Sequence, residues 1–160
     1  MLEATSMERR IRDYFDACND ADYEGIRSHF VPDGAVHYFP PGMYGGPFVG
    51  SDAIAARWVA AVRDLGSVWT VDQVVTDPPG ARAVIEWSHF KTATSTLLRG
   101  DEWYVFDPEN GLIREIRAYY AAPQDPGLPR NELGGFDYRE RGYPIESPFV
   151  RSAPEPGERG

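Results

Sequence analysis

The chain has 160 residues, 42% of them hydrophobic and 26% charged, which is the composition of one ordinary globular domain that buries a core. The formal net charge of −9 argues against nucleic acids and anionic membranes as partners, because both require a basic surface. The single cysteine, Cys18, excludes an internal disulfide and a cysteine-rich zinc site, and the N-terminal residues lack an apolar signal core, so we expect a cytoplasmic protein.

Three amphipathic segments in the first 65 residues predict helices. The expected helices cover residues 7–19, 22–30 and 51–65. Thr5 and Glu8 have the spacing of a capping box at the start of the first helix, and Ser51 begins the third. Residues 35–39 predict a short strand, and the proline- and glycine-rich stretch 40–47 predicts a loop.

After Gly66 the hydrophobic period changes from helical to alternating, which predicts a sheet. The expected strands cover residues 68–76, 81–92, 96–106 and 112–121. Their short connections indicate antiparallel hairpins, and the order of the elements indicates an α+β domain in which helices cover one face of a curved sheet.

The composition changes again near residue 123. Proline and glycine crowd the remaining residues, yet aromatic residues continue among them, whereas a disordered tail normally lacks aromatics. We therefore expect a domain over residues 1–122 and an ordered extension over 123–160, packed on the domain or on a partner subunit, with frayed ends after about Ser152.

Two segments carry a resemblance to a known superfamily. Residues 13–26 (DYFDACNDADYEGI) and 100–117 (GDEWYVFDPENGLIREIR) resemble the nuclear transport factor two-like superfamily, which includes ketosteroid isomerase, scytalone dehydratase, limonene-epoxide hydrolase and the SnoaL-like polyketide cyclases. The resemblance spans about residues 7–122 and implies a cone-shaped α+β barrel: three N-terminal helices packed in a strongly curved, mostly antiparallel sheet with a deep pocket. It specifies the fold and leaves the function open, because the superfamily hosts enzymes, binding modules and transport adaptors.

Strand alternation selects the side chains that face the helices. In the second strand of the meander the inward set includes Trp87 and His89, whereas Ser88 belongs to the outward set. The inward set of the last strand includes Ala118 and Tyr120.

The strand 96–106 carries apolar residues on both faces, so alternation alone does not orient it. The resemblance to ketosteroid isomerase places Glu102 inside, because the hydrogen-bonding carboxylic acid of that family falls on this position, and Tyr104 shares its face. In the short strand, either His37 or Tyr38 faces inward. The resemblance puts Tyr38 where the isomerase has its aspartate base, so the proton shuttle of that enzyme is missing.

Three residues are candidates for acid–base chemistry. The resemblance implies that Tyr14 donates a hydrogen bond to a substrate oxygen; the alternative is a core tyrosine with a satisfied hydroxyl. His89, beside Trp87, is either a general base or acid near neutral pH or a structural histidine. Glu102 is either a buried acid that donates a hydrogen bond beside Tyr14 or an exposed strand carboxylate.

Other residues are expected to contact the substrate through their place in the predicted pocket. They are His37, Tyr38, Phe39, Trp58, Trp87, Tyr104, Ala118 and Tyr120. No cofactor and no metal are expected, because the three histidines show no ligand spacing and no glycine-rich phosphate loop follows a strand. Epoxide hydrolysis is not expected either, since Ala118 stands where the related hydrolases have an aspartate.

Two functions follow. The first is a cofactor-independent acid–base enzyme, of isomerase, dehydratase or cyclase type, acting on a small, mainly apolar molecule that bears a carbonyl or hydroxyl group. The second is a non-catalytic module of the same fold for small-molecule binding or dimeric assembly, which a His89 tied down by core hydrogen bonds would favour. Under both, the sheet face that carries Trp103 and Val105 is expected to form a homodimer.

Overall fold

The computed structural model describes residues 2–40, 44–120, 130–131 and 137–151. Its helices are α1 (Ala4–Asn19), α2 (Tyr23–Ser28) and α3 (Ser51–Leu65). Its strands are β1 (Val36–Tyr38), β2 (Phe48–Val49), β3 (Ser67–Asp77), β4 (Arg82–Lys91), β5 (Thr96–Phe106), β6 (Ile113–Tyr120) and β7 (Arg130–Asn131). The predicted α+β arrangement is confirmed, and the short strands β2 and β7 are additions that the sequence did not predict.

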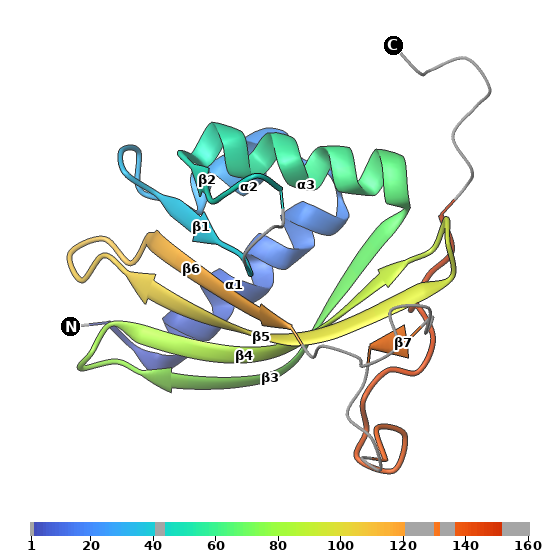
Figure 1. Cartoon of the computed structure of the whole chain (residues 1–160). Coiled ribbons are helices and arrows are strands. Elements are labelled where there is room, and N and C mark those ends of the chain that lie inside the picture. Colours follow the sequence, from blue (N-terminus) through green and yellow to red (C-terminus); the bar gives the residue numbers. More distant parts are fainter. Residues whose placement is uncertain (1, 41–43, 121–129, 132–136, 152–160) are drawn as a thin grey trace.

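The sheet has the strand order β2-β1-β6-β5-β4-β3, with β7 beside β5. Strands β3 to β6 form the predicted antiparallel meander, whereas β1 runs parallel to β6. Figure 1 shows the sheet curving around the helices, which lie on its concave side. The path of strands begins at β2 and ends at β3, so the cone is a curved sheet that does not close.

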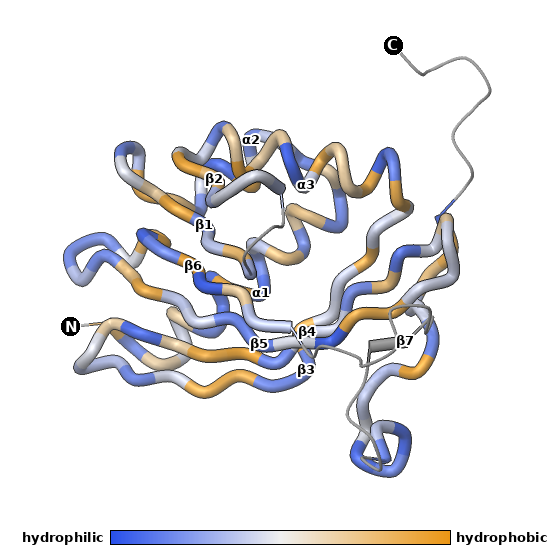
Figure 2. Tube along the Cα trace, in the orientation of Figure 1, coloured by the Kyte–Doolittle hydropathy of each residue, from blue (hydrophilic) through white to orange (hydrophobic). Residues whose placement is uncertain are grey.

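Alternation along the long strands explains which side chains reach the helices. Polar and apolar residues alternate along much of the sheet in Figure 2. In β4 the predicted inward residues, among them Ile85, Trp87 and His89, are buried. In β5 the buried set contains Glu102 and Tyr104, as the resemblance implied. Both apolar and ionisable side chains therefore project from the concave face of the sheet into the interior.

Helix α1 begins earlier than predicted. Its N-cap is Glu3, whose side chain makes no capping hydrogen bond, so the predicted capping box of Thr5 and Glu8 is wrong. Thr5 and Glu8 both lie inside the helix. The first buried residue of its apolar stripe is Met7, one turn after the N-cap. The stripe continues to Tyr14, and this packing, rather than a cap, fixes the helix and aims the tyrosine inward.

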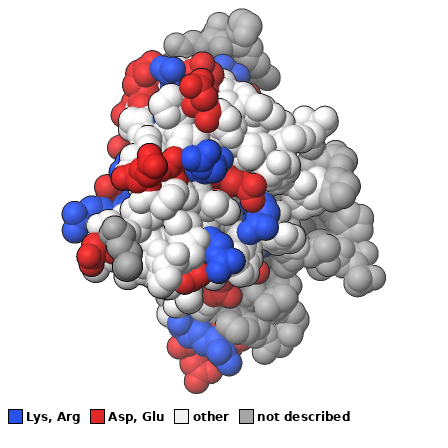
Figure 3. All heavy atoms as spheres, turned by 90° about the vertical axis from the view of Figure 1, so that its left-hand side faces the viewer, with Lys and Arg blue, Asp and Glu red and all other residues white. Residues whose placement is uncertain are grey.

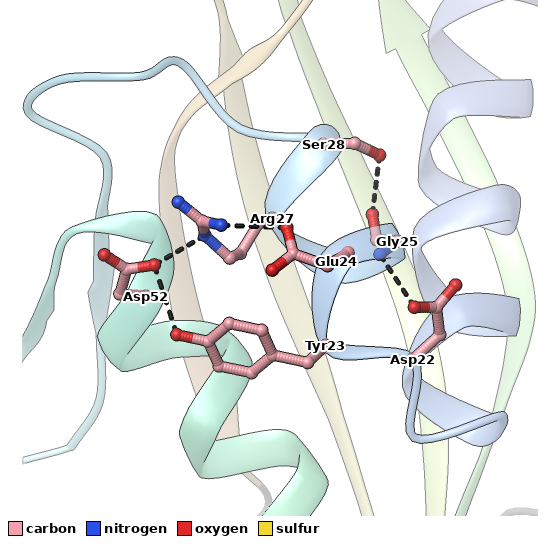
Figure 4. Close-up of polar contacts among 7 residues, drawn as sticks. All are labelled: Asp22, Tyr23, Glu24, Gly25, Arg27, Ser28 and Asp52. Atoms are coloured by element: carbon pink, nitrogen blue, oxygen red, sulfur yellow. Dashed lines mark hydrogen bonds and ion pairs between the residues drawn. The ribbon is translucent and has the colours of Figure 1, made fainter.

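Helix α2 ties the start of α3 to the rest of the helical layer (Figure 4). The Asp22 carboxylate caps α2 by accepting a hydrogen bond from the Gly25 amide at 2.9 Å. Tyr23 donates its hydroxyl hydrogen to Asp52 at 3.1 Å, and the Arg27 guanidinium lies 2.5 Å from the same carboxylate. These contacts hold the first turn of α3 and so help to position the side chains farther along that helix.

The end of α3 requires a glycine. Gly66 follows the helix in the left-handed conformation, with φ of 60°, which suits a residue without a β-carbon. A β-carbon at this position would also clash with the Thr92 hydroxyl. Because Gly66 reverses the chain directly into β3, it sets the edge strand against the helix layer.

The outer face of the sheet is partly covered by residues 137–151. Arg99 donates to the Pro144 carbonyl at 3.0 Å and lies 4.0 Å from the centre of the Tyr138 ring. Ser88, predicted to face solvent, is fully buried here, where it hydrogen-bonds Asp72 at 2.5 Å and Arg99 at 2.6 Å. The prediction for Ser88 is wrong because this cover comes from a segment distant in the sequence.

The described part of the extension therefore lies on its own domain. Arg151 donates to the carbonyl oxygens of Ser67 and Asn19 at 2.8 and 2.6 Å. The predicted fraying after Ser152 falls on residues outside the described ranges. None of the helices described is both long enough and apolar enough to cross a lipid bilayer.

Charges of both signs mix on the face of the molecule seen in Figure 3. Exposed ion pairs close two of the hairpins, with Arg82 2.7 Å from Asp77 and Arg114 2.5 Å from Asp107. Such exposed pairs contribute little to stability, because solvent screens them. On that face the two signs offset one another, so no strong field of one sign arises there.

Candidate functional site

A narrow cavity lies between the concave face of the sheet and the helices α1 and α3. Its volume is about 20 Å³, which is room for about one water molecule. The lining residues are Tyr14, Phe15, Cys18, Tyr44, Trp58, Trp69, Trp87, His89, Glu102 and Tyr120. The three candidates for acid–base chemistry, Tyr14, His89 and Glu102, thus meet in one cavity although they come from α1, β4 and β5.

Tyr14 projects from α1 with its hydroxyl buried. The indole nitrogen of Trp58, on α3, donates a hydrogen bond to this hydroxyl at 2.7 Å. Burial raises the pKa of Tyr14 well above its ordinary value, and the nearby Cys18 and Glu102 raise it further. The phenol therefore keeps its proton at neutral pH, and because its oxygen accepts from Trp58, that proton remains the group it can donate.

His89 projects from β4 but is held by β3. Its Nε2 lies 2.7 Å from the Ser67 hydroxyl, and its ring stacks on Trp69 with centroids 4.6 Å apart. Burial, together with the positive charges of Lys91 and Arg57, lowers the pKa of His89 to about 3. At neutral pH the imidazole is consequently uncharged, so it has no extra proton to give and is a weak base.

Glu102 is a buried carboxyl group in the wall of the cavity. Its Oε2 accepts a hydrogen bond from the Tyr104 hydroxyl at 2.5 Å, and its Oε1 lies 3.5 Å from Nε2 of His37. Burial raises the pKa of Tyr104 well above its ordinary value, and the adjacent Glu102 raises it further. Tyr104 therefore stays a hydrogen-bond donor and fixes one oxygen of the carboxyl group, while the side chain still reaches the cavity.

The short strand β1 places His37 and Tyr38, whose orientation the sequence left undecided, on opposite faces of the sheet. His37 faces inward and is fully buried, whereas Tyr38 is 43% exposed on the other face. Tyr38 therefore lies outside the cavity and lines a shallow hollow on the surface instead. His37 stacks on Phe39 with ring centroids 4.2 Å apart and stands behind Glu102, and neither ring reaches the cavity wall.

Of the other residues predicted to contact the substrate, some line the cavity and others do not. Trp58, Trp87 and Tyr120 line the cavity. Tyr104 is buried beneath Glu102, and Ala118 lines the surface hollow beside Tyr38, so neither is part of the wall. The indole nitrogen of Trp87 is buried and has no hydrogen-bond partner among the residues described.

The sequence did not predict four of the residues that line the cavity: Phe15, Cys18, Tyr44 and Trp69. Trp69 pairs directly with His89 across β3 and β4, so the register of that hairpin would have revealed it. Tyr44 lies in the loop before β2, where no periodicity points to an inward side chain. It shares the cavity wall with Tyr120, and its ring lies 4.4 Å from the Arg57 guanidinium carbon.

The site offers groups for acid–base chemistry. Within the described ranges no set of three or more His, Cys, Asp or Glu side chains is placed to hold a metal ion. What the cavity presents is one carboxyl group, a protonated phenol, a neutral imidazole and an indole N–H between aromatic walls. Such a set can bind an oxygen-bearing apolar molecule and exchange protons with it.

Comparison with known proteins agrees with this architecture. A protein of unknown function with a cystatin-like fold from Methylobium petroleophilum is 54% identical, with 94% of this chain and 99% of that chain covered and a TM-score of 0.75. A polyketide cyclase candidate from Sinorhizobium meliloti is 22% identical, with 71% and 98% covered and a TM-score of 0.58. The epoxide hydrolase/cyclase-like enzyme SalBIII, described for pyran ring formation in salinomycin, is 17% identical, with 75% and 94% covered and a TM-score of 0.60.

None of the curated proteins compared matches the chain. The model of the SnoaL-like domain matches residues 11–116, which is well over half of the sequence and includes nearly all of the two segments that carried the resemblance. Those segments, the curved open sheet and the enclosed helices agree with one another, and the chain belongs to the SnoaL-like family.

Proposed function

We propose that the protein is a cofactor-independent acid–base enzyme, of cyclase, isomerase or dehydratase type. Its substrate is a small, mainly apolar molecule with a carbonyl or hydroxyl group. The observation that carries this proposal is the presence of the Glu102 carboxyl group and the Tyr14 phenol in one buried cavity. A proton acceptor and a hydrogen-bond donor in the same low-dielectric space are what enolate chemistry requires.

The walls support the substrate class. Aromatic side chains make up most of the lining, so an apolar body fits the cavity better than a highly charged one. The buried indole N–H of Trp87, without a partner in the described part of the chain, supports an acceptor oxygen on the ligand, because an unpaired buried donor costs about 1–3 kcal/mol. Together with Tyr14, Trp87 can hold a carbonyl oxygen from two sides of the cavity.

Glu102 performs the proton transfer in this mechanism. Its carboxylate takes a proton from the carbon beside the substrate carbonyl, and the electron pair of that C–H bond moves into the enolate. Tyr14 donates its hydrogen bond to the enolate oxygen. Glu102 then returns the proton, to another carbon in an isomerisation or to a leaving hydroxyl in a dehydration. His89, neutral and fixed to Ser67, orients the substrate and does not serve as the base that the sequence suggested.

Substrate entry needs a movement of the wall, since the cavity as it stands holds little more than water. Tyr44 is 39% exposed, more than any other lining residue, and lies in the loop before β2. A shift of Tyr44 away from Tyr120 opens the cavity toward solvent without disturbing the sheet.

A second function has an observation in its favour. His89 is tied to Ser67 and Trp69, which is the arrangement expected of a structural histidine, and this supports a non-catalytic module that only binds a small molecule. The two functions differ in whether Glu102 is needed for turnover or only for binding.

The test is a ligand screen with product analysis. The wild-type protein is heated with steroid-like, terpenoid and polyketide-like ketones and hydroxyketones, and every compound that raises the melting temperature is incubated and analysed for product by mass spectrometry and NMR. We expect at least one stabilising compound to be converted. Stabilisation without conversion by any compound would instead establish the binding module.

We also propose that the protein forms a homodimer through the outer face of β5 and β6. Trp103 and Tyr119 are 41% and 55% exposed on this face, beyond the part covered by residues 137–151, which supports a partner there. Light scattering should give twice the mass of one chain for the wild type and the mass of one chain for Trp103→Glu. A monomeric wild type would contradict the proposal.

A further inference from the structure

An arginine lies at the edge of the cavity, next to the residue that closes it. Arg57 projects from the middle of α3, one residue before Trp58 of the cavity wall. Its guanidinium carbon lies 4.4 Å from the centre of the Tyr44 ring, and Tyr44 lines the cavity in turn. Arg57 is not itself a lining residue, so Tyr44 is the side chain that contacts both the guanidinium and the cavity.

The two acidic residues of α3 are engaged by other arginines. Asp52, in the first turn, lies 2.5 Å from the Arg27 guanidinium (Figure 4). Asp64, near the other end, lies 2.7 Å from Arg63. Between them, Arg57 forms no ion pair and no hydrogen bond with any residue in the described part of the chain. Its positive charge is therefore available to a ligand.

Part of the Arg57 side chain is buried without a hydrogen-bond partner. The residue is only partly exposed, and its Nε is enclosed although no acceptor of the described ranges reaches it. A buried N–H without an acceptor is unfavourable, so a ligand that supplies acceptor oxygens here gains free energy. The Tyr44 ring compensates only in part, because an aromatic face attracts a cation more weakly than a carboxylate does.

The positive charge of Arg57 acts on groups inside the cavity. Burial lowers the pKa of His89, and the charges of Lys91 and Arg57 lower it further. Burial raises the pKa of Tyr120, whereas the charge of Arg57 acts in the opposite direction. The chain carries a net charge of −9 and repels anions as a whole, so a local positive charge is what lets an anionic group approach the cavity.

We propose that Arg57 binds a carboxylate group of the substrate, so that the substrate is a keto acid or hydroxy acid with an apolar body. This inference rests on the function proposed above and narrows its substrate class. The guanidinium presents its N–H groups in a planar fork that matches the two oxygens of a carboxylate, and one guanidinium balances one negative charge. A phosphate monoester carries nearly two negative charges at neutral pH and would stay partly uncompensated. Arg57 thus determines specificity by holding the end of the substrate that does not react.

The same contact gives a cause for the movement of Tyr44. The Tyr44 ring lies against the guanidinium and closes the cavity beside Tyr120. A carboxylate that binds Arg57 takes over the guanidinium from the ring, and Tyr44 is then free to swing out. Binding of the charged end therefore opens the path for the carbonyl end, an effect that an uncharged ketone does not have.

Pairs of ligands that differ only in charge test the proposal. Levulinate, benzoylpropionate and naphthoylpropionate, which are keto acids of increasing size, and their methyl esters are titrated into the full chain by calorimetry. We expect at least one acid to bind about tenfold more tightly than its ester, as charge-assisted hydrogen bonds require. In Arg57→Gln the acid should bind no better than its ester, whose affinity stays unchanged.

The matched control is Arg63→Gln, which removes a positive charge from the same helix at an arginine that already has a carboxylate partner. It should keep the preference for the acid. Equal affinities of acid and ester in the wild type, a preference that survives in Arg57→Gln, or the absence of binding by all three pairs would overturn the proposal. Should Arg57→Gln fail to fold, Arg57→Lys decides: it keeps the charge but loses the planar fork, so an undiminished preference would refute the carboxylate site.

These titrations need no turnover, so they can fail separately from the proposed function. A preference for the acid that Arg57→Gln abolishes, without conversion of any ligand, would keep the carboxylate site and refute the enzyme. Conversion of ketones without any preference for the acid would refute the carboxylate site and leave the enzyme. With a converted keto acid, Arg57→Gln should raise KM about tenfold and change kcat less than about twofold, because the guanidinium binds substrate and transition state alike.

Discussion

His37 and His89 are both buried histidines on the concave face of one sheet, but their neighbours give them opposite chemistry. His89 meets a hydroxyl group at 2.7 Å, stacks on a tryptophan and feels the positive charges of Lys91 and Arg57. His37 stacks on Phe39 and faces the Glu102 carboxyl group at 3.5 Å. The first environment opposes a positive charge on the ring, whereas the second places a carboxyl group beside it.

The comparison shows that burial alone does not identify a catalytic histidine. His89 lines the cavity, yet its low pKa leaves it neutral, while His37 lies behind the wall and faces Glu102, which reaches the cavity. Burial is the largest cause of the low pKa of His89, and the positive charges of Lys91 and Arg57 lower this pKa further. The following changes test this difference, beginning with the largest expected effect.

Removal of the carboxylate partner of His37 should have the largest effect. Glu102→Gln keeps the shape of the side chain but cannot accept a proton, so kcat/KM should fall by about 10²–10⁴-fold. Steady-state assays on a converted substrate measure it. The control Asp101→Asn alters an exposed carboxyl group of the same strand and should retain full activity. A Glu102→Gln variant as active as the control would show that the proton moves elsewhere.

Tyr14→Phe should come next. The variant removes the hydrogen-bond donor for the developing enolate, which lowers kcat by about 10²–10³-fold. It also leaves the Trp58 indole N–H without an acceptor, at a cost of about 1–3 kcal/mol in the free energy of unfolding. Kinetics and chemical denaturation report the two effects separately. Normal kcat together with reduced stability would assign Tyr14 to the core alone.

The low pKa of His89 predicts a loss of stability in mild acid. The folded state binds a proton here only near pH 3, whereas the unfolded chain binds one below about 6.5, so protons favour unfolding between these values. From pH 7.5 to 5.0 this group removes about 2 kcal/mol from the free energy of unfolding. Denaturation of His89→Gln at both pH values should show a pH dependence smaller by that amount. Equal pH dependence in the wild type and the variant would mean that His89 is protonated in the folded state.

The smallest effect is expected for the partner of His89. Ser67→Ala removes a neutral hydrogen bond, so the free energy of unfolding should fall by about 1 kcal/mol while kcat changes less than twofold. Thermal denaturation and the same kinetic assay measure both quantities. A large loss of kcat would give the Ser67–His89 contact a part in the chemistry and remove the contrast between the two histidines.

Regular periodicity is what made the fold predictable from the sequence. The strands β4 and β5 are long enough for alternation to orient Trp87 and His89, and the resemblance supplied the orientation of Glu102. Strand β1 has three residues, too few to show a pattern, so His37 and Tyr38 stayed undecided until the parallel pairing with β6 was known.

The functional contacts were less predictable because they join distant segments. The contact of His37 with Glu102 depends on β6 lying between β1 and β5, and the contact of Ser88 with Arg99 lies under residues 137–151. The same holds for His89, because Ser67 and Trp69, which contact it, lie on another strand. Local pattern assigns a residue to a face, whereas its partners on that face come from the register of the whole sheet.

Solvent exchange on a bound ketone tests most directly whether Glu102 moves a proton within this cavity. Ketones that stabilise the protein are incubated in D₂O with the wild type, Glu102→Gln or Asp101→Asn, and deuterium at the carbon beside the carbonyl is followed by NMR. We predict incorporation with the wild type and Asp101→Asn at rates well above the uncatalysed reaction, because the proton held by Glu102 exchanges with D₂O before it is returned, and none above that background with Glu102→Gln. Equal incorporation by all three proteins, or binding without any incorporation, would contradict the role of the Glu102 carboxyl group.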